Sequence, residues 1–247
     1  MKRLKNRIAI VTGASRGIGK AIALAFAKEG ANVVATARTT QAIEALERQI
    51  SEQSGVECLA VTADLELEED IQRVTAESLS RFGRIDILVN NAGIIHPRID
   101  LVDFDPSLWR HVVEVNLIAA ALLTKAVLPS MIKNRSGKII NMSSIGGRRG
   151  GKSRTAYRVT KAALISFTES VAAEVKEFNI DVNCICPGLV DTEGAREAFG
   201  LKGREENPKL LRPEEIAELA VFLASDASSA ITGSAVDAYG GMNPLFR

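Results

Sequence analysis

The stretch RIAIVTGASRGIG, from Arg7 to Gly19, decides the fold. Its first six residues form an apolar run typical of a strand that is buried in a parallel sheet. Three glycines follow in the spacing Gly-x-x-x-Gly-x-Gly, and an alanine-rich segment up to about Glu29 predicts a helix. Glycines let the backbone approach a pyrophosphate closely, and a helix N-terminus directs free N–H groups towards it. The stretch therefore indicates a dinucleotide site.

The same alternation of strand and helix continues along the chain. Further strands are predicted at about 32–37, 57–62, 85–89, 137–142 and 180–186 and after Gly233, with helices between them. This pattern predicts an α/β protein with a doubly wound, Rossmann-type fold and helices on both faces of the sheet. We expect the 247 residues to form a single domain, with an irregular substrate lid at about 189–212.

An unusually apolar segment runs from about Pro106 to Ile132. It has more apolar positions than one helix face can hold, so we expect a helix that is packed on the sheet and covered on its outer side as well. This favours an oligomer. Asn116 lies inside the segment, and a polar group in such surroundings needs hydrogen-bond partners.

Composition excludes several classes of protein. The net charge of +1 gives no electrostatic attraction to nucleic acid or to a membrane. Cys58, Cys184 and Cys186, with His96 and His111, show no metal-ligand spacing, and an odd cysteine count argues against a disulfide framework. There is no signal-peptide pattern and no uninterrupted apolar run of membrane-spanning length. We expect a soluble cytoplasmic protein without a metal.

Cofactor preference is indicated at the end of the second strand. An acidic residue there would bind the ribose 2′-hydroxyl of NAD, but the sequence has Arg38, and Arg16 lies in the glycine turn. Two guanidinium groups suit a 2′-phosphate, which favours NADP(H) over NAD(H). Alternatively, Arg38 only begins a solvated helix. Asp64 could accept a hydrogen bond from the adenine amino group, could cap the following helix, or both.

Two polar segments follow later strands. The segment Asn90-Asn91-Ala92-Gly93 comes after the fourth strand, which lies beside the first in a doubly wound sheet. It therefore borders the cofactor, unless it is a generic turn. Ser143 and Ser144 follow the fifth strand, at the edge where such sheets bind ligands.

The chemistry is indicated by Tyr157 and Lys161, which share one face of a helix because they are four residues apart. A neighbouring ammonium favours the phenolate and lowers the pKa of a phenol. A hydroxyl from Ser144 could bind the oxygen of a bound carbonyl. The three groups suit carbonyl reduction or alcohol oxidation, although the pair alone could be a surface helix pair.

A basic cluster lies between the serine and the tyrosine: Arg148, Arg149, Lys152 and Arg154. Near the mouth of a site it could steer an anionic substrate or an acidic carrier protein. The alternative is a solvated loop.

Taken in order, these motifs resemble the short-chain dehydrogenase/reductase family along nearly the whole chain. The resemblance rests on Thr12-Gly13-x-x-x-Gly17-x-Gly19, Asp64-Leu65, Asn90-Asn91-Ala92-Gly93, Asn116, Ser144, Tyr157-x-x-x-Lys161, and Pro187-Gly188 with Thr192. It implies a seven-stranded parallel sheet and a homotetramer. It also implies a cofactor site of Gly13, Ser15, Arg16, Gly17, Ile18, Gly19, Arg38, Asp64, Leu65, Asn91, Ala92, Gly93, Tyr157, Lys161, Pro187, Gly188 and Thr192.

The implied catalytic residues are Asn116, Ser144, Tyr157 and Lys161. Tyr157 would be the general acid in reduction, and Lys161 would lower its pKa and bind the ribose of the nicotinamide. Ser144 would polarise the substrate carbonyl, and Asn116 would hold a water that relays protons to Lys161.

The chain departs from the family pattern near its end. Ala238 and Tyr239 precede the paired glycines, Asp237 falls on a strand that is normally apolar, and the lid looks shorter than usual. We expect an NADPH-dependent oxidoreductase similar to 3-oxoacyl-carrier-protein reductases. The alternatives are a sugar or polyol dehydrogenase of the same family and a non-catalytic NADP(H)-binding sensor.

Overall fold

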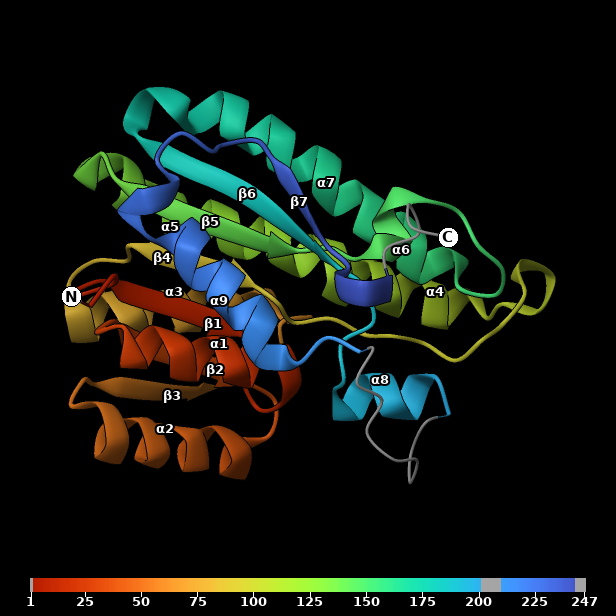
Figure 1. Cartoon of the computed structure of the whole chain (residues 1–247), viewed down its shortest axis with the longest axis horizontal. Coiled ribbons are helices and arrows are strands. Elements are labelled where there is room, and N and C mark those ends of the chain that lie inside the picture. Colours follow the sequence, from red (N-terminus) through yellow and green to blue (C-terminus); the bar gives the residue numbers. More distant parts are fainter. Residues whose placement is uncertain (1, 201–209, 243–247) are drawn as a thin grey trace.

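A parallel sheet of seven strands forms the centre of the molecule, in the order β3-β2-β1-β4-β5-β6-β7 (Figure 1). The structure is a computed structural model, and it describes residues 2–200 and 210–242. The expected fold and strand number are confirmed. The strands are β1 (Ile8–Thr12), β2 (Asn32–Ala37), β3 (Cys58–Thr62), β4 (Ile87–Asn90), β5 (Gly137–Met142), β6 (Ile180–Pro187) and β7 (Ala235–Ala238).

Helices cover both faces of this sheet. Side chains of α1, α2 and α9 pack in one buried cluster, and those of α3, α5 and α7 pack in a second cluster on the opposite face. The main helices are α1 (Gly17–Lys28), α2 (Thr40–Ser54), α3 (Glu68–Phe82), α4 (Pro106–Val113), α5 (Ala119–Asn134), α7 (Thr155–Val175) and α9 (Pro213–Ala224), and the short ones are α6 (Ile145–Arg148) and α8 (Glu193–Ala198).

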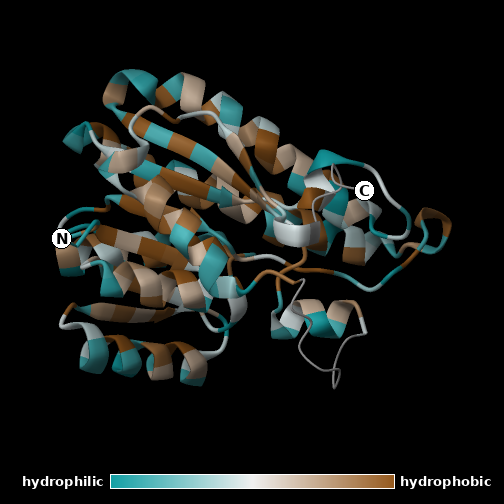
Figure 2. Cartoon of the chain, viewed as in Figure 1, coloured by the Kyte–Doolittle hydropathy of each residue, from teal (hydrophilic) through white to brown (hydrophobic). Residues whose placement is uncertain are grey.

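The two-residue period of a strand explains this division. All five residues of β1 are buried, yet Ala9 and Val11 belong to one core cluster and Ile10 to the other. A strand covered on both sides needs such a continuous apolar run. The helices are two-sided instead: α2 buries Ile43 and Leu46 and turns hydrophilic residues outwards, as Figure 2 shows.

The apolar segment predicted as one helix is broken by a π-helical turn, η2 (Glu114–Ile118), between α4 and α5. Single π turns of this kind often occur at functional sites because they re-aim side chains. From Pro106 to Asn134 the helix is long and apolar enough to cross a membrane by length and composition. Its buried residues Leu123, Val127 and Met131 nevertheless pack in the core beneath the sheet.

Two other segments differ from the expectations. The lid predicted as irregular contains the helix α8 and a bridge between Val190 and Leu211, while its residues 201–209 lie outside the described residues. Asp237, unusual on the last strand, is paired with Arg148 at 2.8 Å. The chain thus supplies a partner for the charge that this strand carries.

Candidate active site

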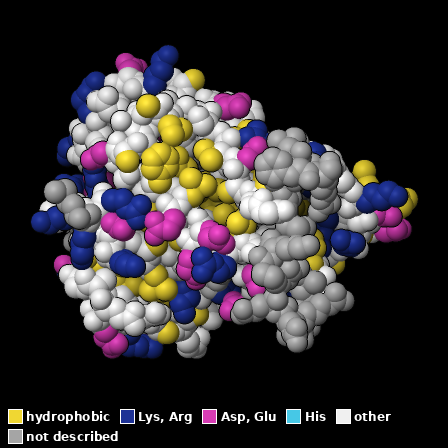
Figure 3. Space-filling view, in the orientation of Figure 1, with side chains coloured by type: hydrophobic (Ala, Val, Ile, Leu, Met, Phe, Trp, Pro, Cys, Tyr) yellow, Lys and Arg dark blue, Asp and Glu magenta, His cyan; other side chains and the backbone are white. Residues whose placement is uncertain are grey.

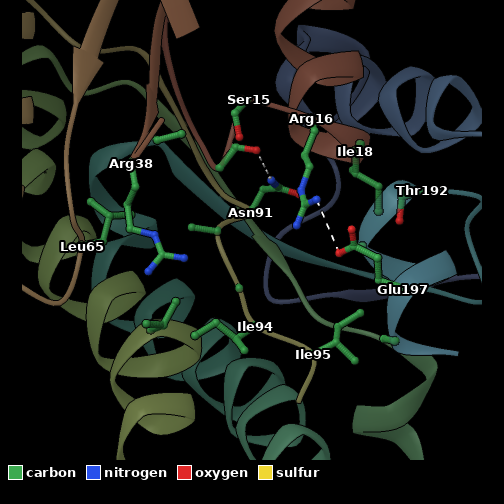
Figure 4. A pocket seen from close by; sticks show the side chains of 18 of the residues that line it. Ser15, Arg16, Ile18, Arg38, Leu65, Asn91, Ile94, Ile95, Thr192 and Glu197 are labelled. Carbon is green, nitrogen blue, oxygen red and sulfur yellow. Dashed lines mark hydrogen bonds and ion pairs between the residues drawn. The ribbon is translucent and has the colours of Figure 1, made fainter. Parts of the chain in front are cut away.

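A cavity of about 870 Å³ opens at the carboxyl ends of the strands, where open α/β sheets bind ligands. Figure 4 shows Ser15, Arg16 and Arg38 on one side of it and Ile94 and Ile95 on another (Figure 4). The predicted cofactor residues that line it are Gly13, Ser15, Arg16, Gly17, Ile18, Arg38, Leu65, Asn91, Ala92, Gly93 and Thr192.

The glycine turn has the geometry of a phosphate cradle. Gly13 and Gly17 have φ of 63° and 57°, in the left-handed region that favours glycine. A Cβ on Gly19 would lie 2.3 Å from the carbonyl oxygen of Gly13, so only glycine allows this close packing. Among the described residues, no side chain caps α1 at Arg16, and its first turn has no acidic residue. The positive end of this helix is therefore left for an anion, which fits a dinucleotide pyrophosphate.

Two arginines line the cavity near the ends of β1 and β2, where the sequence predicts the adenosine ribose. The side chain of Arg16 is 56% exposed, and its Nη1 lies 3.6 Å from Oε2 of Glu197 on α8 (Figure 4). Arg38 is exposed and also lines the cavity. Both positions fit the prediction of a site for the ribose 2′-phosphate.

Asp64 does not cap α3, so that alternative is wrong. Helix α3 begins at Glu68 with Leu67 as its N-cap residue. The carboxylate of Asp64 instead accepts from the backbone N–H of Glu66 at 3.2 Å, and Leu65 rather than Asp64 lines the cavity. Six of the predicted cofactor residues lie outside the lining: Gly19, Asp64, Tyr157, Lys161, Pro187 and Gly188.

The segment after β4 is tied to β1 and is not a generic turn. The hydroxyl of Thr12 donates to the carbonyl of Val89 and accepts from the N–H groups of Asn91 and Ala92, both at 2.9 Å. The side-chain amide of Asn91 donates to the carbonyl of Thr12 at 2.8 Å. These bonds hold the two segments that border the cofactor site in fixed register.

Asn116 lies in the π turn and is 1% exposed. Its Oδ1 accepts from the N–H of Ile94 at 2.6 Å, and its Nδ2 donates to the carbonyl of Ile94 and to Oγ1 of Thr160. These three hydrogen bonds are directed to the loop after β4 and to α7, and the second lone pair of Oδ1 is not used by any of them. Asn116 connects the cofactor loop with the helix that carries Tyr157.

Ser144, Tyr157 and Lys161 come together at this edge of the sheet. Oγ of Ser144 accepts from the N–H of Gly146, and a Cβ on Gly146 would lie 3.3 Å from the Tyr157 ring and 3.4 Å from that Oγ. Nζ of Lys161 lies 5.7 Å from the centroid of the Tyr157 ring and donates to the carbonyl of Met142 at 2.7 Å. Lys161 is only 5% exposed, so the two residues are no surface pair.

Burial dominates the ionisation of both groups. Burial raises the pKa of Tyr157, while the Ser144 hydroxyl and the charges of Arg154 and Arg158 lower it. Burial lowers the pKa of Lys161 to about 8. The expectation that Lys161 lowers the pKa of Tyr157 stays a prediction: the ammonium group donates to the carbonyl of Met142 and lies 5.7 Å from the centroid of the Tyr157 ring.

Sequence reasoning missed the segment after Gly93 and part of α8. Ligands bind beyond the carboxyl ends of strands, so the position of this segment after β4 was the available signal. The residues of helix α8 gave no such signal, because the segment that contains them was predicted to be irregular. The lining residues that were missed are Ala37, Ala63, Ile94, Ile95, Pro97, Arg98, Val115, Gly194, Glu197, Ala198 and Phe199.

The basic cluster between Ser144 and Tyr157 does not form one patch. Arg148 pairs with Asp237, and Arg149 and Lys152 are exposed. Arg154 is 5% exposed and lies beneath the segment after β4. A shared steering role for the four side chains does not fit this arrangement.

Comparisons with known proteins agree with this geometry. A family model described as enoyl-(acyl carrier protein) reductase matches residues 13–243. The 3-oxoacyl-[acyl-carrier-protein] reductase FabG of Chlamydia trachomatis is 40% identical, over 97% of this chain and 98% of its own length. The enzyme of the same name from Escherichia coli is 37% identical, over 96% of this chain and 98% of its own.

The fold matches solved structures equally well. The L-sorbose reductase of Gluconobacter frateurii, solved with NADPH and L-sorbose, superposes with a TM-score of 0.91 at 35% identity, covering 99% of both chains. The chain shares its motif order, its fold and a full-length sequence identity of this degree with these enzymes. The chain belongs to the short-chain dehydrogenase/reductase family and is an oxidoreductase.

Proposed function

We propose that this protein is an NADP(H)-dependent reductase of carbonyl compounds, similar to the 3-oxoacyl reductases. The observation that carries the proposal is the assembly of Ser144, Tyr157 and Lys161 at the edge of the sheet where β1 leads into the glycine turn. Ser144 after β5 and the pair Tyr157 and Lys161 on α7 place a hydroxyl, a proton donor and a cation at one edge of the sheet. A non-catalytic sensor would have no use for this arrangement.

Each side chain has a separate task in the proposed reaction. When bound, NADPH supplies the hydride. Tyr157 donates its phenolic proton to the carbonyl oxygen of the substrate, while Ser144 donates a hydrogen bond to the same oxygen and fixes its position. Lys161 holds the ribose hydroxyls of the nicotinamide, and Asn116 holds a water from which protons reach Lys161. The buried edge of the cavity excludes other water from the reacting atoms.

The cofactor is NADP(H) in preference to NAD(H). Arg16 and Arg38 line the adenosine end of the cavity, and a guanidinium group binds phosphate with two parallel hydrogen bonds. The related L-sorbose reductase was solved with NADPH. The preference for the phosphorylated cofactor favours reduction as the working direction.

The substrate class follows the relatives by name. The reductases from Chlamydia trachomatis and Escherichia coli act on 3-oxoacyl groups of a carrier protein. A sugar or polyol is the second candidate, because the L-sorbose reductase is also similar over its full length.

The protein is proposed to be a cytoplasmic homotetramer. Three free cysteines suit a reducing compartment, and charges of both signs are interspersed on the face in Figure 3. The α4–η2–α5 helix is apolar from Pro106 to Asn134 but only 39% buried along its most hydrophobic part, so a second subunit would cover the rest. The segment from 189 to 212 is proposed to close as a lid over the substrate.

The proposal is tested by NADPH oxidation across a panel of 3-oxoacyl thioesters, sugars and simple ketones, with wild type and Tyr157→Phe. Removing a general acid lowers turnover by roughly 10²–10⁴-fold. Binding of NADPH, followed by its fluorescence, should stay within about twofold of wild type because the phenol is not part of the phosphate cradle. Full turnover by Tyr157→Phe, or no turnover of any carbonyl by wild type, would contradict the proposal.

A further inference from the structure

Arg154 is a buried cation beside the reacting centre. It is the N-cap residue of α7, stands three residues before Tyr157 and is 5% exposed. One terminal nitrogen donates to the carbonyl of His96, and the other donates to the carbonyl of Ala198 at 2.7 Å. Its guanidinium carbon lies 4.9 Å from the centroid of the Phe199 ring. Arg154 therefore connects the segment after β4 with helix α8.

Among the described residues, these contacts leave the charge of Arg154 without a counter-ion. Within residues 2–200 and 210–242 the terminal nitrogens of Arg154 donate to backbone carbonyls and to no carboxylate, and its Nε is buried with no hydrogen-bond partner there. Charged groups are rarely buried unless they are paired, because desolvation costs several kcal/mol. A guanidinium carries five N–H donors, of which the described carbonyls use only some. The guanidinium group of Arg154 therefore suits a further hydrogen-bond acceptor that carries a negative charge.

The cavity lies directly beside this group. Pro97, Ala198 and Phe199 line the cavity, and each is either a partner of Arg154 or adjacent to one. The exposed Arg98 lines the cavity too, and its charge adds to the positive potential at Arg154. The cavity's own carboxylate, Glu197, is turned towards Arg16 (Figure 4).

The positive charge also reaches the reacting group. Burial raises the pKa of the Tyr157 phenol, and the charge of Arg154 opposes this rise. Because Arg154 stands three residues before Tyr157 at the start of the same helix, an anion bound at Arg154 would lie near the carbonyl that Tyr157 protonates. A carrier thioester is neutral around its 3-oxo group and would offer neither arginine a negative charge.

We propose that the substrate is a short oxo acid with a free carboxylate, or the hydroxy acid formed from it, and that Arg154 and Arg98 bind this carboxylate. The inference rests on the proposed carbonyl reductase function and narrows its substrate class. Arg154 would provide charge-assisted hydrogen bonds from the buried side, and Arg98 would complete the ion pair from the open side.

The test compares two substrates with the same carbon skeleton, 3-oxobutanoate and its methyl ester, in NADPH oxidation. Wild type should prefer the acid by at least roughly tenfold in kcat/KM, because a charge-assisted hydrogen bond discriminates by about that factor or more. Arg154→Gln keeps amide donors for the backbone carbonyls but removes the charge. It should lower kcat/KM for the acid by roughly 10–100-fold, mainly through KM, and change that for the ester by less than about threefold. Arg149→Gln, an exposed arginine outside the cavity lining, is the matched control.

A second measurement does not depend on turnover of the acid. Malonate should inhibit ester reduction competitively in wild type and in Arg149→Gln, but much less in Arg154→Gln and Arg98→Gln. If Arg154→Gln does not fold, the proposal is tested by malonate inhibition of Arg98→Gln and by the wild-type ratio of kcat/KM for the acid to that for the ester.

The outcomes separate the two proposals. Equal losses for acid and ester in Arg154→Gln would make Arg154 only a clamp on α8 and would overturn the carboxylate site. A wild-type preference for the ester, or reduction of other ketones but of neither test compound, would overturn it while leaving the reductase function intact. Failure to reduce any carbonyl compound would overturn the function itself.

Discussion

The two ends of the cavity both hold arginines, but in opposite environments. At the adenosine end, Arg16 has a side chain that is 56% exposed, and Arg38 is exposed as well. At the catalytic end, Lys161 and Arg154 are each 5% exposed, and burial lowers the pKa of both. The cations at the adenosine end are exposed to solvent, and those at the catalytic end are buried.

The difference in solvent exposure fits the different functions proposed for the two ends. A hydrated guanidinium binds and releases a phosphate at little conformational cost, and its attraction is screened by salt. A desolvated cation is costly to keep charged, but its field acts strongly in a site without water. Cations at the adenosine end should therefore control affinity, and those at the catalytic end should control rate and substrate choice.

Lys161→Met tests the catalytic end and should have the largest effect on activity. We expect turnover to fall by roughly 10²–10³-fold, within the range for loss of a residue that acts on proton transfer. The folded protein should nevertheless be at least as stable as wild type near pH 7, because the substitution removes a buried charge. Steady-state kinetics and thermal unfolding of the cofactor-free protein measure the two effects.

The pH dependence of this stability difference has a definite sign. The pKa of Lys161 is about 8 in the folded chain, against an ordinary value of 10.5. The unfolded chain thus binds the extra proton between these values, so the wild-type penalty is complete below pH 8 and fades as the pH rises towards 10.5. The Tm advantage of Lys161→Met should shrink over the same interval. An advantage that grows with pH would show that the ammonium is not desolvated.

Arg16→Ala and Arg38→Ala test the hydrated end. Each should raise KM for NADPH by roughly 10-fold or more while leaving kcat nearly unchanged, because a charge-assisted phosphate contact is lost. KM for NADH should change little, and the difference from wild type should shrink at high salt. Arg48→Ala, an exposed arginine on α2 outside the lining, is the control. A loss of kcat equal to that of Lys161→Met would abolish the distinction between the two ends.

Glu197→Gln should have the smallest effect. Arg16 and Glu197 are 3.6 Å apart and both about half exposed, and such surface pairs contribute only about 0–1 kcal/mol. Releasing Arg16 for the phosphate should therefore tighten NADPH binding by about two- to fivefold. Fluorescence titration measures this, with Glu193→Gln on the same helix as control. Weaker binding would show that Glu197 supports the cofactor site.

Local pattern predicted most of the fold and the glycine turn that lines the cavity. Strand β5 (Gly137–Met142) and the first glycine turn lie where the sequence placed them, because buried strands and glycine turns carry strong local signals. The π turn around Asn116 was not predicted, because the apolar pattern on either side of it continues without a break. The role of Asp64 as a cap was wrong because α3 begins four residues later.

The sequence by itself determined the order of strands and helices, the phosphate-binding turn and the Tyr-Lys pair on one helix, since each depends on neighbours along the chain. The tertiary structure alone decided which cations are buried and desolvated. It buried Arg154 beneath His96 and Ala198, paired the nearby Arg148 with Asp237, and left Arg16 and Arg38 in water. Desolvation depends on what packs over a side chain from distant segments, and that packing is set by the fold and not by the residue's neighbours in sequence.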